Sequence, residues 1–141
     1  MVEAILADHS DSGVRYAGFV EDTSAVLPDY GWLLLPSDAE GLSNAMIEAM
    51  AAGVVPVTTR VSGCVDHIVP GRTGFFLEGV DDSSLQAGLR QIGSRSPADW
   101  RAMSIPVGDH ARAHFEIGKV VERYRDLYQS LPERPQQEKA R

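Results

Sequence analysis

The sequence has little cysteine, no long hydrophobic run and no excess of positive charge. Its single cysteine, Cys64, cannot form an internal disulfide, which excludes a disulfide-stapled secreted scaffold and a four-cysteine zinc site. Apolar stretches such as 31–36 and 49–57 are far shorter than the roughly 20 residues that a membrane-spanning helix needs. The first residues lack the basic region and apolar core of a secretion signal. These absences predict a cytoplasmic protein in a reducing environment.

The charge of the chain argues against a nucleic-acid partner. Lys and Arg number 13 against 20 Asp and Glu, and the formal net charge is -7. A protein that follows a phosphate backbone needs the opposite sign, and no local cluster of basic residues supplies it. The 141 residues can bury one hydrophobic core but not two, so we expect one domain or part of one.

Short β-branched or aromatic runs alternate with longer helical patterns in the first part of the chain. This alternation is typical of parallel βα units. The spacing predicts strands over 14–17, 31–35, 54–58 and 74–77. It predicts helices over 1–9, 23–30, 43–52, ended by Gly53, and 65–69. We therefore expect an α/β fold in three layers, with a mostly parallel sheet covered by helices on both faces.

The last part of the chain is purely helical. Asp82 or Ser83 can cap a helix that continues to residue 92, and Ser96, Pro97 and Asp99 have the pattern of a helix start with a capping box. A final amphipathic helix is predicted over 116–130. Residues 131–141 show no periodicity and are predicted to be a flexible tail, which leaves one partial domain over residues 1–130.

A polar loop between the strand at 31–35 and the helix at 43–52 is the best candidate for a binding site. Ligands of doubly wound sheets collect at the carboxyl ends of the strands, where this loop must lie. Gly41 allows close approach to the backbone, and Leu42, Ser43 and Asn44 offer free amide groups at a helix N-terminus. Such a terminus attracts phosphate through hydrogen bonds and the helix dipole.

Glu48 is the unusual residue of the same helix. Its sequence neighbours are apolar, and an unpaired carboxylate buried among them would be costly. The residues three and four positions away are all small, which leaves space beside the carboxylate: Asn44, Ala45, Ala51 and Ala52. A sugar diol fits that space, because two hydroxyls can bond an ionised carboxylate.

A purely structural interpretation of these residues stays open from the pattern alone. In that interpretation Ser43 caps the helix, Glu48 points to solvent and Glu40 is an ordinary loop acid. Two glutamates separated by seven positions are by themselves a weak motif in a chain with this many acids.

A longer series of motifs resembles the donor-binding region of family 4 retaining glycosyltransferases, which have the GT-B fold and a Rossmann-like second domain. The resemblance covers about residues 14–77 in order. Its motifs are Val14-Arg15-Tyr16-Ala17-Gly18-Phe19-Val20, Pro36-Ser37, Glu40-Gly41-Leu42-Ser43-Asn44, Glu48-Ala49-Met50-Ala51-Ala52-Gly53, Pro56-Val57 and Gly71-Arg72-Thr73-Gly74-Phe75.

The resemblance implies roles for the residues of the loop and the helix. Glu40 would be the catalytic-site residue that approaches the hydroxyls and anomeric region of the donor sugar, without being a nucleophile. Glu48 would hold the ribose hydroxyls of a nucleoside-diphosphate sugar. The amides of Gly41, Leu42, Ser43 and Asn44 would contact the sugar and diphosphate. No Asp-x-Asp pair occurs in the chain, which favours a donor site without metal and without a further cofactor.

The resemblance is incomplete. The family usually has paired glycines and then a glutamate where this chain has Ser62-Gly63-Cys64-Val65-Asp66. The chain matches only the later part of the second GT-B domain, so the resemblance implies a missing N-terminal acceptor domain and a fragment that is inactive alone. Contact with a membrane surface would come only through the absent domain. Two alternatives stay open: a binding-only or vestigial module, and a GT-B sugar-nucleotide epimerase.

In such a partial domain, one edge of the sheet and the apolar face of the final helix would lack the protein segments that normally cover them. Strands that would normally lie at one edge of the sheet are missing, and an exposed edge could pair with a second copy. The final helix has an apolar face that we expect to be covered. That face consists of Ile117, Val120, Val121, Tyr124, Leu127, Tyr128 and Leu131.

The remaining residues that could carry chemistry have simpler interpretations. His110 and His114 lie four apart on a helix, but no third metal ligand follows them and they are predicted to be surface residues. Cys64 is predicted to be a core residue rather than a nucleophile. Trp32 and Trp100 are predicted to pack in the interior rather than to stack on a sugar.

Overall fold

The computed structural model describes residues 13–132. The helix predicted over 1–9 and residues 133–141 of the predicted tail lie outside the described residues. Within residues 13–132, no helix is both long and apolar enough to cross a membrane.

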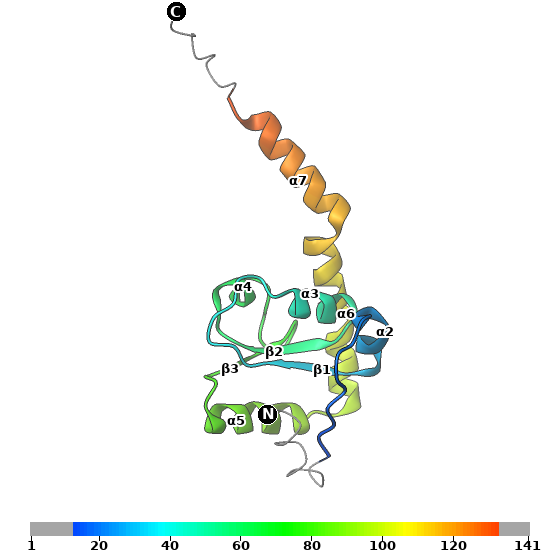
Figure 1. Cartoon of the computed structure of the whole chain (residues 1–141), viewed down its shortest axis with the longest axis vertical. Coiled ribbons are helices and arrows are strands. Elements are labelled where there is room, and N and C mark those ends of the chain that lie inside the picture. Colours follow the sequence, from blue (N-terminus) through cyan, green and yellow to red (C-terminus); the bar gives the residue numbers. More distant parts are fainter. Residues whose placement is uncertain (1–12, 133–141) are drawn as a thin grey trace, which may run out of the picture.

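A three-stranded parallel sheet forms the centre of the molecule, in the order β1-β2-β3 (Figure 1). β1 (Trp32–Leu35), β2 (Val55–Thr59) and β3 (Phe75–Leu77) confirm the strands predicted at 31–35, 54–58 and 74–77. β2 is buried along its whole length, as its apolar and β-branched residues require. All three strands run in the same direction, so their carboxyl ends lie along one edge of the sheet.

Helices cover both faces of the sheet, which confirms the three-layer α/β architecture. α3 (Asn44–Ala51) and α4 (Ser62–Val65) lie on one side and α5 (Asp82–Gly93) on the other (Figure 1). α6 (Pro97–Phe115) packs against α3 and β2. The short α2 (Thr23–Val26) and η2 (Leu27–Asp29) replace the single helix predicted over 23–30. The core joins α3, β2 and α6 through Met46, Met50, Val55, Val57, Met103 and Val107.

Local capping signals set most of the helix ends. Gly53 has a φ of 78° and ends α3 as predicted. Ser96 and Asp99 form the predicted capping box at the start of α6. The cap of α5 is Asp81, whereas Asp82 or Ser83 was expected, because the Asp81 carboxylate accepts hydrogen bonds from the amides and hydroxyls of the next two serines.

Two predicted elements are absent or displaced. Residues 14–17 form no strand, and they are exposed. The helix predicted over 65–69 instead ends at Val65, as α4. The chain after α4 turns because Thr73 Oγ1 donates to the carbonyl of His67 and accepts from the amide of Val69.

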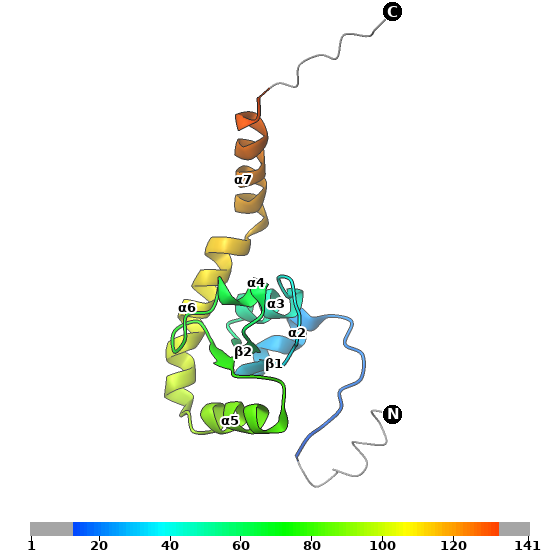
Figure 2. The same ribbon diagram turned by 90° about the vertical axis from the view of Figure 1, so that its left-hand side faces the viewer.

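α7 (Ile117–Ser130) extends away from the α/β body in both views (Figures 1 and 2). The side chains of Lys119 and Arg123 donate to the last carbonyls of α6, which fixes the junction between the two helices. No residue of α7 is buried, and apart from half-buried Val120 its apolar face is exposed. Within residues 13–132, α7 contacts mainly the end of α6, so a cover for this face stays a prediction.

Candidate functional site

The polar loop between β1 and α3 lies across the ends of two strands. Thr59, the last residue of β2, accepts a hydrogen bond from the Ser37 amide at 3.1 Å and donates its hydroxyl to the Ser37 carbonyl. These two bonds hold the loop at the carboxyl edge of the sheet. This is the position expected from the strand and helix pattern.

Glu40 is half-buried in this loop. Its Oε1 accepts a hydrogen bond from the hydroxyl of Ser37 at 3.0 Å, and its carbonyl accepts one from the hydroxyl of Ser62 at 3.2 Å. The first bond orients the carboxylate, and the second attaches the loop to the start of α4. Glu40 is therefore held in place rather than freely solvated.

A close backbone contact between this loop and α4 depends on Gly63. A Cβ atom at Gly63 would lie 2.1 Å from the carbonyl oxygen of Gly41 and 2.5 Å from the amide nitrogen of Leu42. Gly41 itself has open space where its Cβ would be. The sequence predicts a close approach at Gly41 and gives no sign of the one at Gly63, because the contact joins residues that are far apart in the chain.

The N-terminus of α3 has no side-chain cap. Ser43 occupies the N-cap position and is buried, but its hydroxyl makes no capping bond. The helical hydrogen bonds begin with the Ile47 amide, which donates to the Ser43 carbonyl at 3.1 Å. The earlier amides, starting with that of Asn44, have no acceptor within the helix. The capping role that the structural interpretation gave to Ser43 is therefore wrong.

Glu48 is exposed, so the expectation of a carboxylate buried among apolar residues is also wrong. The reason is helical geometry: Met46, Ala49 and Met50 form the buried side of α3, and Glu48 lies off that side. Its Oε2 accepts a hydrogen bond from the Thr23 hydroxyl at 2.7 Å.

The space expected beside Glu48 is present. The carboxylate lines a cavity of about 340 Å³ together with Ser24, Pro28, Ala51 and Ala52. Ala51, the last residue of α3, and Ala52, its C-cap, are small and leave this side of the helix open, as the sequence predicted. Glu40 and Glu48 are held by different elements, since Glu40 contacts the loop and α4 whereas Glu48 contacts α2.

The cysteine and the tryptophans have structural roles, as predicted. Cys64 is fully buried, and burial raises the pKa of its thiol although Thr58 lowers it through a hydrogen bond. The protonated thiol is a poor nucleophile. Trp32 packs against Phe75 with ring centroids 6.1 Å apart, and Trp100 packs against the same core.

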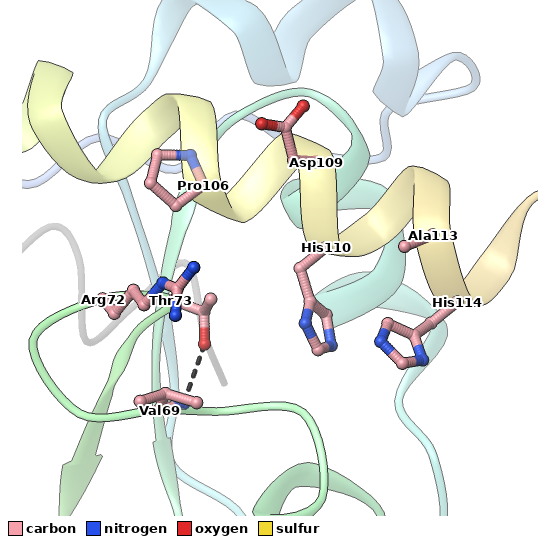
Figure 3. Close-up of a pocket in the computed structure, with 8 residues that line it drawn as sticks. All are labelled: Val69, Arg72, Thr73, Pro106, Asp109, His110, Ala113 and His114. Atoms are coloured by element: carbon pink, nitrogen blue, oxygen red, sulfur yellow. Dashed lines mark hydrogen bonds between the residues drawn. The ribbon is translucent and has the colours of Figure 1, made fainter.

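A cluster of three histidines lies between α6 and the turn that follows α4. His110 and His114 project from α6 toward the same side (Figure 3), and His67, in the turn after α4, meets them. Burial is the main cause that lowers the pKa of His67 and of His110, and the neighbouring imidazoles lower both further. The sequence does not indicate His67 as a third partner for His110 and His114, because 43 positions separate His67 from His110.

Comparisons with known proteins agree with the fold. The family model described as "Glycosyl transferases group 1" matches residues 2–94. Over 73 residues the chain is 32% identical to the capsular polysaccharide biosynthesis glycosyltransferase CapM of Staphylococcus aureus, covering 52% of this chain and 19% of CapM. Over 120 residues it is 27% identical to the N-acetyl-alpha-D-glucosaminyl L-malate synthase of Bacillus anthracis, covering 85% of this chain and 31% of the synthase.

The solved structure of Anabaena Alr3699/HepE in complex with UDP-glucose has a similar fold. It superimposes with a TM-score of 0.75 over 92% of this chain and 37% of HepE, at 17% sequence identity. The chain thus spans about a fifth to a third of the length of these two curated relatives. Because the family model covers most of its residues, the chain belongs to the glycosyl transferases group 1 family.

Proposed function

We propose that this chain is the donor-binding part of a retaining family 4 glycosyltransferase, which transfers a sugar from a nucleoside-diphosphate sugar to an acceptor. The observation that carries the proposal is the uncapped N-terminus of α3, next to a loop held at the carboxyl edge of the sheet. Membership of the family and the UDP-glucose bound by the structural neighbour HepE support the same substrate class.

The diphosphate of the donor would lie at the start of α3. The free amides of residues 41–44 supply hydrogen-bond donors, and the helix dipole adds positive potential. Open space beside Gly41 leaves room for the ligand to approach the backbone. As the bond to the sugar breaks, the same amides would stabilise the charge on the departing nucleoside diphosphate, without a metal ion or a further cofactor.

Glu48 would bind the ribose hydroxyls of the nucleotide. It already lines a cavity, and its carboxylate accepts a hydrogen bond from the hydroxyl of Thr23. A carboxylate can accept hydrogen bonds from several hydroxyls, so a ribose diol could join or replace Thr23. Exposure of Glu48 is compatible with this role, because a residue that binds a diffusible ligand must be reachable.

Glu40 would contact the hydroxyls and the anomeric region of the transferred sugar. Ser37 and Ser62 fix the position of its loop, which is what a group that orients a reacting sugar requires. Glu40 is not assigned as a nucleophile.

The acceptor would be bound by a facing N-terminal domain, and the isolated chain would transfer little. The curated relatives are much longer than this chain, and the exposed apolar face of α7 is a surface that further protein could cover. We also propose that the enzyme is cytoplasmic and that it has no nucleic-acid partner.

The roles of the two glutamates can be separated by ligand titration. Backbone amide shifts of the chain are followed by NMR while UDP, ADP or GDP is added. Glu48→Ala should weaken binding of the preferred diphosphate about tenfold, since one charge-assisted hydrogen-bond acceptor is lost. Glu40→Ala should leave that affinity unchanged and lower turnover once a facing domain is supplied. Glu122→Ala, on exposed α7, is the control.

Unchanged nucleoside-diphosphate affinity in Glu48→Ala would reject the role given to Glu48. Binding without any transfer in the presence of a facing domain and acceptor would instead identify a binding-only module. Release of an epimerised sugar without acceptor would identify an epimerase.

A further inference from the structure

We propose that His67, His110 and His114 form a binding site for one divalent transition-metal ion of the Zn²⁺ class. This inference does not depend on the proposed function, and the three residues are separate from those assigned to the sugar donor. It departs from the sequence-based expectation that no residues of the chain bind a metal.

The spacing of the ring nitrogens carries the inference. Nδ1 of His67 lies 3.2 Å from Nε2 of His110, and the ligand atoms of the three histidines all lie within 4.8 Å of one another. Two nitrogens bound at about 2.0–2.1 Å to a tetrahedral ion are about 3.3–3.4 Å apart. The first pair therefore already has the spacing of two ligands of one ion. His114 is exposed, so its side chain can rotate toward the other two.

Two elements hold the ligands from opposite sides. His110 and His114 lie one turn apart on the 19-residue α6, and their rings stack with centroids 4.2 Å apart. The backbone of His67 is anchored twice: its amide donates to the Cys64 carbonyl, and its carbonyl accepts from Thr73, which is buried. The backbone of His67 is therefore fixed in position, and α6 supplies the other two ligands, His110 and His114.

The surroundings favour a metal that prefers nitrogen ligands. The edge of Phe115 packs against the His67 ring, with centroids 4.6 Å apart. Asp109 points away from the rings in Figure 3 and pairs with Arg112. Three imidazoles without a carboxylate or thiolate are typical of sites for Zn²⁺, Cu²⁺, Ni²⁺ or Co²⁺ rather than Mg²⁺ or Ca²⁺.

An ion at this position would leave one coordination place open. His110 and His114 line a cavity of about 330 Å³, which has room for a water molecule as the fourth ligand. Arg72 also lines the cavity but lies beside Thr73, away from the two rings drawn in Figure 3. The ion would join the turn after α4 to the second half of α6.

The test uses the untagged 141-residue chain after removal of metal with EDTA. Titration calorimetry with ZnCl₂ should give one ion per chain. Substituting Co²⁺ should produce the visible absorption bands of a site with imidazole ligands. His67→Gln, His110→Gln and His114→Gln should each weaken Zn²⁺ binding at least tenfold. His9→Gln is the matched control, since His9 is the remaining histidine of the chain, and it should bind as the unmodified protein does.

Several results would overturn the site. These are a Zn²⁺ affinity weaker than millimolar, an unchanged affinity in His67→Gln, or an equal loss in His9→Gln. If a variant fails to fold by circular dichroism, the unmodified chain decides the question. A Co²⁺ spectrum identical to that of the aqueous ion, or no change in the imidazole ¹⁵N shifts on adding Zn²⁺, would also exclude the site.

Discussion

Because Gly63 has no side chain, α4 can pack closely against the loop that carries Glu40. Its backbone packs directly on that of Gly41 and Leu42, and this contact sets how far the loop after β1 lies from α4. Gly63 thereby helps to set the position of Glu40. The carbonyl of Glu40 accepts a hydrogen bond from Ser62, the residue before Gly63 at the start of α4.

Gly63→Ala is expected to destabilise the fold by about 1–3 kcal/mol, because the added methyl group meets backbone atoms that must shift. It should also weaken nucleoside-diphosphate binding, since the loop moves with them. Urea denaturation and the ligand titration measure the two effects. Gly41→Ala is the matched control: its methyl group enters open space, so stability should change by less than about 0.5 kcal/mol. Equal stability of both variants would contradict the packing argument.

At the scale of elements, local side-chain bonds start two of the longer helices. The Asp81 carboxylate accepts bonds from Ser83 and Ser84 at the start of α5, and these bonds hold its pKa well below the ordinary value. A carboxyl group with a lowered pKa in the folded state stabilises the protein fully above its unfolded-state pKa. That contribution is lost as the pH falls toward the folded-state pKa.

Asp81→Asn removes this titration but retains a residue that can cap a helix. The unmodified chain should therefore have the higher urea midpoint at pH 7, and its advantage should shrink as the pH falls below about 4. Asp82→Asn, an exposed acid one residue later, is the control. A difference between Asp81→Asn and the unmodified chain that stays constant from pH 7 to pH 3 would contradict the ionic role of this cap.

At the scale of the whole molecule, the α/β body and α7 contribute unequally to stability. The body has a continuous core that includes Met50, whereas α7 has no buried residue. Helices shorter than about 12–15 residues are marginal in water without tertiary packing, so α7 depends on its junction with α6. β1 lies at one edge of the described sheet, and pairing of that edge with a second copy stays a prediction.

Substitution on α7 should cost little in the isolated chain. Replacing Tyr124, Leu127 and Tyr128 by serine should change the free energy of unfolding by about 0.5 kcal/mol or less per site, because all three are exposed. Met50→Ala should cost about 2–5 kcal/mol, since it leaves a cavity in the core. Urea denaturation compares the two. A loss above about 1 kcal/mol per α7 site would mean that the apolar face is covered in solution.

Features that depend on neighbouring residues can be predicted from the amino-acid sequence. The three strands, the helix ended by Gly53 and the capping box of Ser96 and Asp99 were predictable, because period, turn and cap signals act within a few positions. The polar loop at the carboxyl edge followed from the strand and helix order. The family resemblance rests on the same local motifs.

Features that join distant segments become visible only in the folded chain. The hydrogen bond from Thr23 to Glu48, the backbone contact of Gly63 with Gly41 and the meeting of His67 with His110 depend on how α2, α4 and α6 pack. The strand predicted at 14–17 did not form, because β propensity depends on the packing context as well as on the local sequence. Packing of distant segments leaves no periodic signal in a single sequence.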